Sequence, residues 1–565
     1  MEDFSSKEEK FEQWRYNISM KKYIPILLII ICILISFVIH VGSQSQGKEI
    51  TQVPELKKKI LLIPLDSRPP CKKLVADNGR TAGIDILVPP GEVMDFYTLP
   101  GETAKLKEWL AREIPKCEDA IISIDQLLYG GLIASRNKAI GDDDIIAVGE
   151  FLKKLHADNP TVKLHAFAIL PRMNPPDYVE KYQDRKRLME WSRLIHKYDD
   201  NPLSETAKKI QELESTIPAE QITGYKEIYN RNLRLNIMLA SLLNDGILTD
   251  LTFGQDDGEA YSLPNLKLKE FMQYTAKHHM ANDAMSIVHG ADEVALSILN
   301  NIITQDNHFK VYIDYSSEGA AAAIMPYMAI SNDETVRERL AFHQDNIVDR
   351  PEEADYILFI SAIEEETVGS RAYSAEKIKG YQQMGKAIAL VDLSKNFSAG
   401  EALLPILIND HYPINSLIAY SGWNTASNSI GTAIAQAEIY LTALTAGDCS
   451  DAVVLSNINN LNNRICEDYY YLKDVIDLVN ISLRKKGYTN VYDLDLEHNY
   501  KWAVDIMEDT MKQRLLQYKS APAFKKPFVV GYTQYTVTDL DISTFFPWPR
   551  TFEIDLTTKP RLEKK

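Results

Sequence analysis

The sequence predicts an α/β protein with a mostly parallel sheet, organised as a (β/α)-barrel-like body. Short, almost continuously apolar runs recur along the chain, and strands of this kind are covered on both faces. Helical stretches separate these runs, and such alternation indicates βαβ units. The predicted strands are 60–65, 84–88, 119–124, 163–170, 249–254, 284–289, 309–314, 355–361, 387–393 and 416–420.

One N-terminal segment is apolar enough to cross a membrane. Residues 24–41 (IPILLIIICILISFVIHV) contain no Asp, Glu, Lys or Arg, and 18 residues just span the hydrocarbon core of a bilayer. A cleaved signal peptide is the alternative, because the small residues Gly42 and Ser43 follow the run. The run is longer than the apolar part of a usual signal peptide. We therefore expect an uncleaved transmembrane signal anchor over residues 23–42.

The charges beside this segment predict its orientation. Arg15, Lys21 and Lys22 precede it, whereas the following side is neutral as far as Lys48. The positive-inside rule then makes residues 1–22 a cytoplasmic tail. We expect a single-pass protein of the cell membrane whose C-terminal domain is extracytoplasmic and begins after a polar linker, residues 43–58.

The net charge of the chain is −17, from 62 Lys and Arg against 79 Asp and Glu. Residues 1–22 hold five basic and five acidic side chains, so the whole excess falls on the extracytoplasmic part. An acidic protein repels phosphate backbones, so we expect no nucleic-acid partner. The only predicted membrane contact is the N-terminal helix.

The extracytoplasmic chain divides into two predicted regions. Residues 59–445 form the main α/β domain, which carries a charged helical insertion over about 178–245. Residues 446–565 form a C-terminal α+β region in which an aromatic, alternating stretch packs on the main domain or closes it. Predicted helices of the main domain include 103–113, 145–157, 291–303 and 428–445.

Four cysteines lie outside the membrane segment, where disulfides can form. Cys449 and Cys466 are near enough in sequence to pair, and buried free thiols are the equal alternative. None of the four, which also include Cys71 and Cys117, has CxxC or zinc-finger spacing. A thiolate metal site is therefore not expected, and no cofactor is predicted.

Polar residues follow many of the predicted strands. Ligand sites in parallel α/β folds lie at the carboxyl ends of strands, so these residues form a candidate shared site. The alternative is that each Asp caps the helix that follows it. The strand-end residues are Asp66, Asp125, Arg172, Asp256, Asp292, Asp314, Asp392 and Trp423.

The segment GQDDGE, residues 254–259, is the sharpest indication of chemistry. Asp256 and Asp257 are adjacent carboxylates, so one can be kept protonated while the other stays charged. Glycosidases use carboxylate pairs as acid and nucleophile, or as acid and orienting group. The alternatives are a plain turn or a loop that binds a hard cation.

Two further motifs supply candidate substrate-binding residues. In DSRPP, Asp66 and Arg68 can grip hydroxyls, or form an internal ion pair that holds the turn. In SIDQLLYGGLIASR, the Gly-Gly pair allows close backbone approach, and Asp125, Tyr129 and Arg136 can stack and hydrogen-bond. The alternative for this second motif is a tight turn with a surface arginine.

A sugar platform is predicted in SGWNTASN, where Trp423 offers an indole face beside the amide of Asn424. The alternative is a tryptophan that covers the end of the core. Arg172, Asp292 and Glu293 complete the candidate binding set, although Asp292 and Glu293 also suit a helix N-terminus.

These motifs together resemble an uncharacterised bacterial family, catalogued as domain of unknown function four-one-two-seven. The resemblance covers about residues 59–445 and implies a large α/β body, but it brings no established reaction. At 392–400 the chain reads DLSKNFSAG where the family implies an Asn-Gly-Ala-Asp-like stretch, which bears on Asp392. The resembling segments are PLDSRPP (64–70), SIDQLLYGGLIASR (123–136), ILPRM (169–173), GQDD (254–257), GADEV (290–294) and AYSGWNTASNSIGTA (419–433).

The sequence thus favours an extracytoplasmic glycoside hydrolase that acts on a carbohydrate, with Asp256 and Asp257 as the catalytic residues. GxSxG, Walker and GxGxxG motifs are absent from the sequence, which disfavours common serine hydrolases, P-loop NTPases and Rossmann dehydrogenases. The alternatives are a metal-dependent hydrolase with Asp and Glu ligands, and a non-catalytic protein of the cell envelope that binds glycans or another protein.

Overall fold

The computed structural model describes the chain from Gly47 to its end at Lys565, with a few short gaps. The segments 1–22 and 23–42, predicted as tail and signal anchor, lie outside the described residues. None of the described helices combines the length and the apolar character that a membrane span needs. The described residues are 47–565 without 138–139, 257, 281–282, 306, 364–367, 397, 424 and 447–449.

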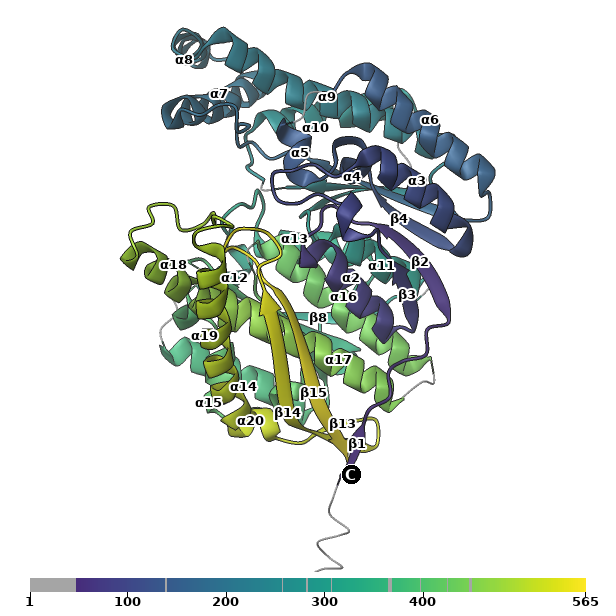
Figure 1. The fold of residues 1–565 in the computed structure, drawn as a ribbon, viewed down its shortest axis with the longest axis vertical. Helices are drawn as coiled ribbons and strands as arrows, with labels where there is room; N and C mark the ends of the chain where they lie inside the picture. Colours follow the sequence, from purple (N-terminus) through teal and green to yellow (C-terminus); the bar gives the residue numbers. More distant parts are fainter. Residues whose placement is uncertain are drawn as a thin grey trace, which may run out of the picture.

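A six-stranded parallel sheet forms the first half of the fold (Figure 1). Its order is β3-β2-β4-β5-β6-β7, so the direction of winding reverses between β2 and β4. Such a topological switch point is where ligands bind in open α/β sheets. The strands are β2 (Lys58–Ile63), β3 (Ile84–Leu87), β4 (Asp119–Ser123), β5 (Lys163–Leu170), β6 (Asp250–Gln255) and β7 (Met285–His289).

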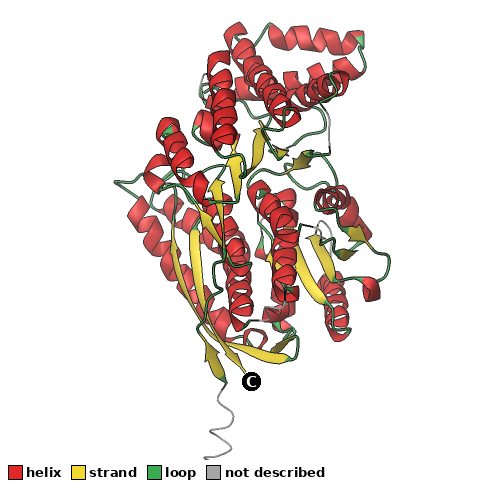
Figure 2. Cartoon of the chain, turned by 90° about the vertical axis from the view of Figure 1, so that its right-hand side faces the viewer, coloured by secondary structure: helices red, strands yellow, loops and turns green. Residues whose placement is uncertain are grey.

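A second parallel sheet, of five strands in the order β12-β11-β10-β8-β9, follows in the chain. Helices separate the two sheets and cover their outer faces (Figure 2). The strands are β8 (Lys310–Tyr315), β9 (Asn346–Ile347), β10 (Tyr356–Ile363), β11 (Ala387–Ser394) and β12 (Ala419–Ser421).

The expected (β/α)-barrel-like body is not what the described strands form. Both parallel sheets are open: β3 and β7 are the edges of the first, and β12 and β9 those of the second. The prediction of parallel strands alternating with helices is confirmed. The alternation could not distinguish a barrel from two open sheets, because both architectures cover parallel strands on both faces.

A small antiparallel sheet, in the order β1-β15-β14-β13, joins the two ends of the described chain. Lys48–Ile50, within the expected linker, is β1 and pairs with β15. Ile50 is buried in the same apolar cluster as Leu540 and Leu562, which explains why this polar stretch is held in a strand. The other strands are β13 (Phe528–Val530), β14 (Thr533–Phe545) and β15 (Asp555–Lys564).

Helices of the first half enclose the six-stranded sheet. The expected insertion, residues 178–245, corresponds to α7, α8 and α9; α7 and α8 project at the top left of Figure 1, whereas the second half of α9 packs on the sheet. The helices are α2 (Pro69–Thr81), α3 (Thr103–Glu113), α4 (Ile124–Tyr129), α5 (Leu132–Asn137), α6 (Asp142–Asp158), α7 (Tyr182–Asp200), α8 (Ser204–Glu214), α9 (Ala219–Asn244), α10 (Leu263–Lys277) and α11 (Val294–Thr304).

Helices of the second half include a rare π-helix, Ile465–Val475, which continues directly from α17. The remaining helices are α12 (Glu318–Ala322), α13 (Asn332–Phe342), α14 (Val368–Gln383), α15 (Leu404–Asn409), α16 (Ala426–Thr445), α17 (Asp451–Arg464), α18 (Ile476–Lys485), α19 (Tyr500–Ser520) and α20 (Pro522–Lys525).

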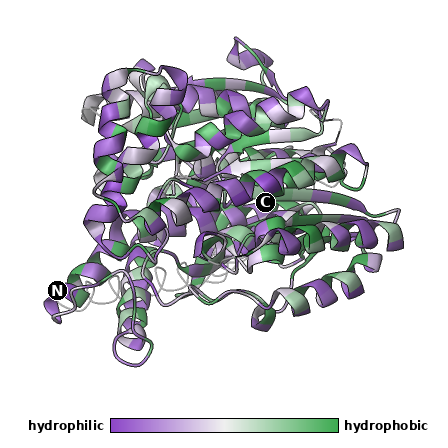
Figure 3. Ribbon diagram, turned by 90° about the horizontal axis from the view of Figure 1, so that it is seen from above, coloured by the Kyte–Doolittle hydropathy of each residue, from purple (hydrophilic) through white to green (hydrophobic). Residues whose placement is uncertain are grey.

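Helix α16 lies between the two parallel sheets and joins their cores. Residues 426–440 of α16 are all buried, as expected for a helix that packs on every side. Ala435 and Ile439 belong to the core on the six-stranded sheet, whereas Ile430 and Ile434 belong to the core on the five-stranded sheet. In Figure 3 long hydrophobic stretches run through the interior of the molecule.

An ionic chain ties the amino ends of β4, β5 and β6 together. His165 Nε2 lies 3.1 Å from Asp119 Oδ1, and its Nδ1 lies 2.5 Å from Asp250 Oδ2. Burial opposes a charged imidazole, but the hydrogen bonds to the two carboxylates outweigh burial and raise the pKa of His165 to about 9. The same chain lowers the pKa of Asp119 to about 2, against the effect of burial.

This histidine predicts how stability depends on pH. Because the pKa of His165 is higher in the folded state than its ordinary 6.5, its contribution is complete below about pH 6.5 and is lost as the pH rises through about 9. The free energy of unfolding should fall by up to about 3 kcal/mol over that window. Urea titrations at a series of pH values measure this fall in the free energy of unfolding.

His165→Gln should remove this pH dependence, while His308→Gln, at an exposed position, should retain it. If the free energy of unfolding of His165→Gln depends on pH as that of wild type does, the role assigned to His165 is contradicted.

Candidate functional site

A buried ion triad stands at the carboxyl end of β2. Arg68 Nε lies 3.0 Å from each carboxylate oxygen of Asp66, and Arg68 Nη2 lies 2.6 Å from Asp66 Oδ2. The other side of the guanidinium reaches Asp292, with Nη2 2.7 Å from Oδ1. Asp66 is fully buried, and Arg68 and Asp292 are 7% and 6% exposed. The expected Asp66–Arg68 pair is therefore an internal clamp, and Asp292 completes it.

Local sequence explains how Arg68 is presented. Pro69 and Pro70 occupy the first turn of α2, so Arg68 takes the extended N-cap conformation. The backbone N–H of Arg68 also donates to Asp66 Oδ1 at 3.0 Å. Asp292 arrives from the loop between β7 and α11, 224 residues along the chain.

The electrostatics of the triad favour a charged arginine. Although burial acts against the cation, Asp292 and Asp66 raise the pKa of Arg68 above its already high ordinary value. Burial also raises the pKa of Asp292, and Arg68 opposes that increase. Two carboxylates thus share one guanidinium, which leaves an excess of negative charge at this edge of the sheet.

Asp95 adds a further acid that sequence reasoning missed. Its Oδ1 accepts a hydrogen bond of 2.9 Å from the backbone N–H of Ser67. Burial, and next the charge of Asp66, raise the pKa of Asp95 to about 8. Gly131 packs so closely that a Cβ built on it would lie 3.0 Å from Asp95 Cγ, and its φ is 123°. The close approach expected of the Gly-Gly pair is therefore confirmed, and Asp95 is what it approaches.

The C-terminal region closes the triad from outside. Trp548 donates from Nε1 to Ser67 Oγ at 2.8 Å, and Arg68 Cζ lies 5.2 Å from the centre of its ring. Arg550 Cζ stacks 4.8 Å from the same ring. Trp548 is 1% exposed, so the segment between β14 and β15 covers the carboxyl end of β2. The aromatic FPWP sequence was the available signal for it.

Asp125 and Asp256 stand farther along the same edge, in contrasting environments. Asp125 is buried and accepts 2.8 Å from the backbone N–H of Ile169. Burial, with a contribution from the charge of Asp256, raises the pKa of Asp125 to about 7. Asp256 is less buried and forms an ion pair of 3.7 Å with Arg172 Nε. Asp125 is thus suited to carry a proton near neutral pH, whereas Asp256 is the partner of an arginine.

Two predicted site residues cannot be placed. Asp257, the second carboxylate of the predicted catalytic pair, and Asn424 of the predicted sugar platform lie outside the described residues. Among the residues that are described, the carboxyl edge of the six-stranded sheet therefore gathers six charged side chains, and we call it the acid edge. They are Asp66, Arg68, Asp125, Arg172, Asp256 and Asp292.

In the described part of the predicted platform, Trp423 does not offer an exposed indole face. Trp423 is 6% exposed and belongs to the apolar core behind the five-stranded sheet. Its carbonyl accepts a hydrogen bond of 3.2 Å from Ser429 Oγ in the first turn of α16. The apolar indole is more stable in this core than in water, so it covers the end of the core instead of facing a ligand.

Glu293 also has a packing role instead of the expected substrate contact. It forms an ion pair with Arg339 of α13, and both side chains are fully buried. Burial raises the pKa of Glu293 to about 7 although Arg339 opposes the increase. The pair joins α11 to α13, so Glu293 serves the contact between the two halves of the fold.

Tyr129 and Arg136 face the helical insertion. Tyr129 is 2% exposed and lies under Arg231 of α9, whose Cζ is 5.1 Å from the ring centre. Burial raises the pKa of Tyr129 to about 12. Arg136 is close enough to Tyr229 of the same helix to influence the pKa of its phenol. These residues join α4 and α5 to α9, and Tyr129 lies near enough to Asp125 for that carboxylate to contribute to the raised pKa of its phenol.

Asp314 and Asp392, at the ends of strands in the five-stranded sheet, are also held internally. Asp314 binds Lys377 Nζ at 2.7 Å. Asp392 accepts from the backbone N–H groups of Leu403 and Leu404, at 2.8 and 3.0 Å. Asp392 thus satisfies the start of α15, which is the capping alternative.

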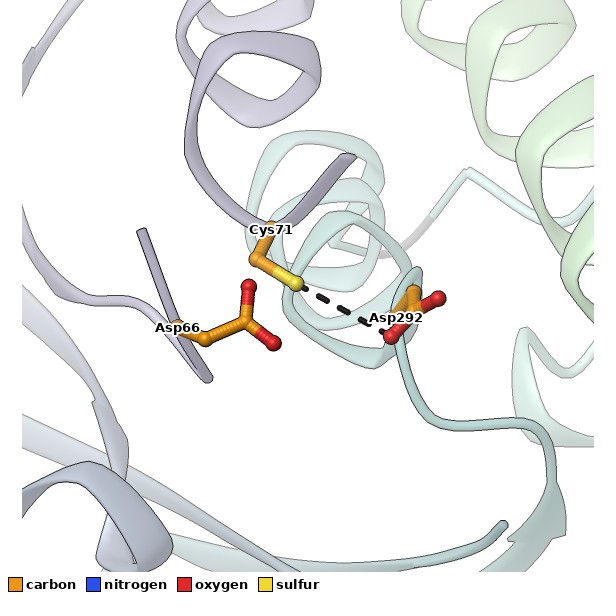
Figure 4. Close-up of side chains that lie close together, drawn as sticks. All are labelled: Asp66, Cys71 and Asp292. Atoms are coloured by element: carbon orange, nitrogen blue, oxygen red, sulfur yellow. Dashed lines mark hydrogen bonds between the residues drawn. The ribbon is translucent and has the colours of Figure 1, made fainter. Parts of the chain in front are cut away.

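One group in the described part of the chain has metal-ligand geometry. Asp66, Cys71 and Asp292 offer ligand atoms within 4.8 Å of one another (Figure 4). Cys71 Sγ points toward Asp292, 4.0 Å from its Oδ1. Burial, and next the charge of Asp66, raise the pKa of the Cys71 thiol, so the thiolate is disfavoured. Arg68 already bridges both carboxylates, so a cation would have to displace it.

Cys71, Cys117 and Cys466 are buried free thiols, and Cys449 lies outside the described residues.

Comparison with known proteins gives one family. Residues 60–557 match the family model described as "Protein of unknown function (DUF4127)", which confirms the resemblance seen in the motifs. No curated protein and no solved structure matches the chain.

The triad predicts a large loss of stability when its cation is removed. Arg68→Met should lower the free energy of unfolding by about 3–5 kcal/mol, because it leaves two buried carboxylates without a partner. Denaturant unfolding measures the change. Arg112→Met, at an exposed position on α3, should change stability by less than about 0.5 kcal/mol. A loss below about 1 kcal/mol in Arg68→Met contradicts the clamp.

Proposed function

The chain belongs to this family of unknown function, and we propose that it is a hydrolase that cleaves a glycosidic bond, with Asp125 as the acid and Asp256 as its charged partner. One observation carries the proposal: two neighbouring carboxyl groups at the carboxyl edge of a parallel sheet have environments of opposite kind. Asp125 is buried and has a pKa of about 7, while Asp256 is paired with Arg172. Such a pair is the usual requirement for glycoside hydrolysis.

In this mechanism the protonated carboxyl of Asp125 donates its proton to the leaving oxygen as the glycosidic bond breaks. The carboxylate of Asp256 either attacks the anomeric carbon, forming a glycosyl-enzyme that water then hydrolyses, or takes a proton from the water molecule that attacks that carbon. Arg172 forms an ion pair with Asp256. Asp257 adjoins Asp256 in sequence; the sequence alone pairs these two carboxylates, whereas the mechanism proposed here pairs Asp256 with Asp125. Asp66, Arg68 and Asp292 do not touch substrate here; they fix the loops that carry the edge.

We further infer that a single N-terminal span anchors the protein in the cell membrane, with the two-sheet body on the extracytoplasmic side. The uncharged residues 24–41 and the basic residues that precede them support this orientation. A glycan of the cell envelope is then the nearest substrate, and the net charge of −17 favours a neutral or amino sugar over an anionic one.

A metal-dependent hydrolase is the second candidate, favoured by the grouping of Asp66, Cys71 and Asp292. Carboxylates beside a bound cation can activate water for hydrolysis. This reading requires the guanidinium of Arg68 to leave its two carboxylates, so the glycosidase proposal, which keeps the clamp intact, accounts for more of the geometry.

Substitution of the two acids tests the glycosidase. Asp125→Asn and Asp256→Asn should each lower kcat by about 10²–10⁴ in a screen of chromogenic glycosides and cell-wall fragments, because each removes a group that acts in the transition state. Wild-type activity should decline as the pH rises above about 7, since Asp125 must be protonated. Asp143→Asn, at an exposed position on α6, is the matched control. Full activity in both acid variants, with normal folding, refutes the assignment.

Chelation separates the two candidates. Turnover of the purified full chain should be unchanged after treatment with EDTA, because the proposed acid and its partner act without a metal. Loss of activity that a divalent ion restores, together with metal bound in a ratio near one per chain, would favour the metal-dependent reading. If the protein is a glycosidase that acts without a metal, Cys71→Ala should leave its activity intact. If it is a metal-dependent hydrolase, Cys71→Ala should lower its affinity for the metal.

A further inference from the structure

A cavity lies at the amino-terminal edge of the six-stranded sheet, opposite the carboxyl edge that gathers the acids. Its volume is about 350 Å³, within the range of small-molecule sites. The first residues of β2, β4, β5 and β6 line it, so it is separated from the acid edge by the length of the strands. Nothing in the proposed hydrolysis uses this cavity.

Four of the six titratable groups in its wall form one chain of ion pairs, and the other two, Lys163 and Asp283, are exposed and of opposite sign. Lys58 Nζ lies 2.6 Å from Asp119 Oδ2, and Asp119 in turn binds His165, which binds Asp250. Positive and negative groups therefore alternate along one chain. A ligand that brought a full charge would have to compete with these short internal pairs, so the wall suits a neutral molecule.

The rest of the lining is suited to a hydroxylated ligand. Thr252 and Ser286 contribute hydroxyls, and Gln305 and Gln344 contribute amides. These groups both donate and accept hydrogen bonds, as sugar hydroxyls require. Ile298, Ile302 and Phe342 supply an apolar part of the wall for the C–H surface of a ring.

Gln344 occupies a position where glycine would make the protein more stable. It follows α13 with φ 60°, while the N–H groups of Gln344 and Asp345 bond back to Ala341 and Leu340 at 3.1 and 2.9 Å. This is the helix-ending motif in which glycine is usual, because a side chain is strained at positive φ. Gln305, at the end of α11, also has a positive φ, of 47°. Both strained glutamines line the same cavity, and strain of this kind is concentrated at functional sites.

We propose that this cavity binds a small neutral polyhydroxylated molecule, of the size of one or two sugar rings, and that Gln344 hydrogen-bonds to it. The amide is retained at a strained position because it serves the ligand, not the fold. The site is independent of the proposed glycosidase chemistry and lies at the opposite end of the strands from Asp256.

The chain supplies a matched control for Gln344. His411 follows α15 with φ 56°, and the N–H groups of His411 and Tyr412 bond back to Ile408 and Leu407 at 3.1 and 2.9 Å. His411 has the same helix-ending motif as Gln344 and is also exposed. Unlike Gln344, His411 does not line this cavity. Glycine should relieve strain at both positions and raise the Tm by about 1 °C or more in each case.

The experiment is calorimetric titration of the full chain with glucose, N-acetylglucosamine, cellobiose and chitobiose. Wild type should bind at least one of these probes, and Gln344→Gly should weaken that binding at least tenfold while its Tm does not fall. His411→Gly and Asp256→Asn should bind as wild type does.

Two outcomes overturn the proposal. If none of the four probes binds wild type, the cavity is not a site for this class of ligand. If binding is retained in Gln344→Gly but lost in Asp256→Asn, the sugar occupies the acid edge instead. Because the acid variant is included, failure of this proposal is distinguishable from failure of the glycosidase.

Discussion

The architecture of the acid edge depends on Arg68. Its guanidinium holds Asp66 from the loop after β2 and Asp292 from the loop after β7, although β4, β5 and β6 separate these strands in the sheet. Burying three charges is costly unless they are paired and hydrogen-bonded, and here both carboxylates receive the same cation. The clamp draws the loop after β7 across the carboxyl ends of the intervening strands. It thereby fixes the loops beside Asp125 and Asp256, and Trp548 covers Arg68 from the outside.

The two halves of the fold meet through helices and not through a shared sheet. Helix α16 gives one side to each parallel sheet, and the buried pair of Glu293 and Arg339 adds a polar contact between α11 and α13. The antiparallel sheet then brings Lys48–Ile50 and the C-terminal strands together, and its connection between β14 and β15 reaches back to the carboxyl end of β2. Segments far apart in sequence thus converge on one edge.

Sequence reasoning predicted much of this edge because its elements are local. The apolar strands, the polar residues after them and the Pro-Pro turn that presents Arg68 each follow from a few neighbouring residues. What could not be predicted depends on long-range contacts. The partner of Arg68 lies 224 residues away, and Asp95 becomes part of the edge through contacts with Ser67 and Gly131. Trp423 was expected to face a ligand because composition cannot tell a platform from a core residue. A barrel and two open sheets likewise share one pattern of alternation, so closure of the sheet was beyond the sequence.

The central claim is that Asp125 carries a proton near neutral pH because it is buried beside a charged Asp256. Nuclear magnetic resonance of carboxyl groups labelled with ¹³C in aspartate, assigned through Asp125→Asn, measures this directly. The account predicts that Asp125 titrates near pH 7 and that its pKa falls in Asp256→Asn, where the neighbouring charge is gone. A carboxyl at position 125 that titrates near the ordinary 3.8, or one that does not respond to Asp256→Asn, would contradict the account.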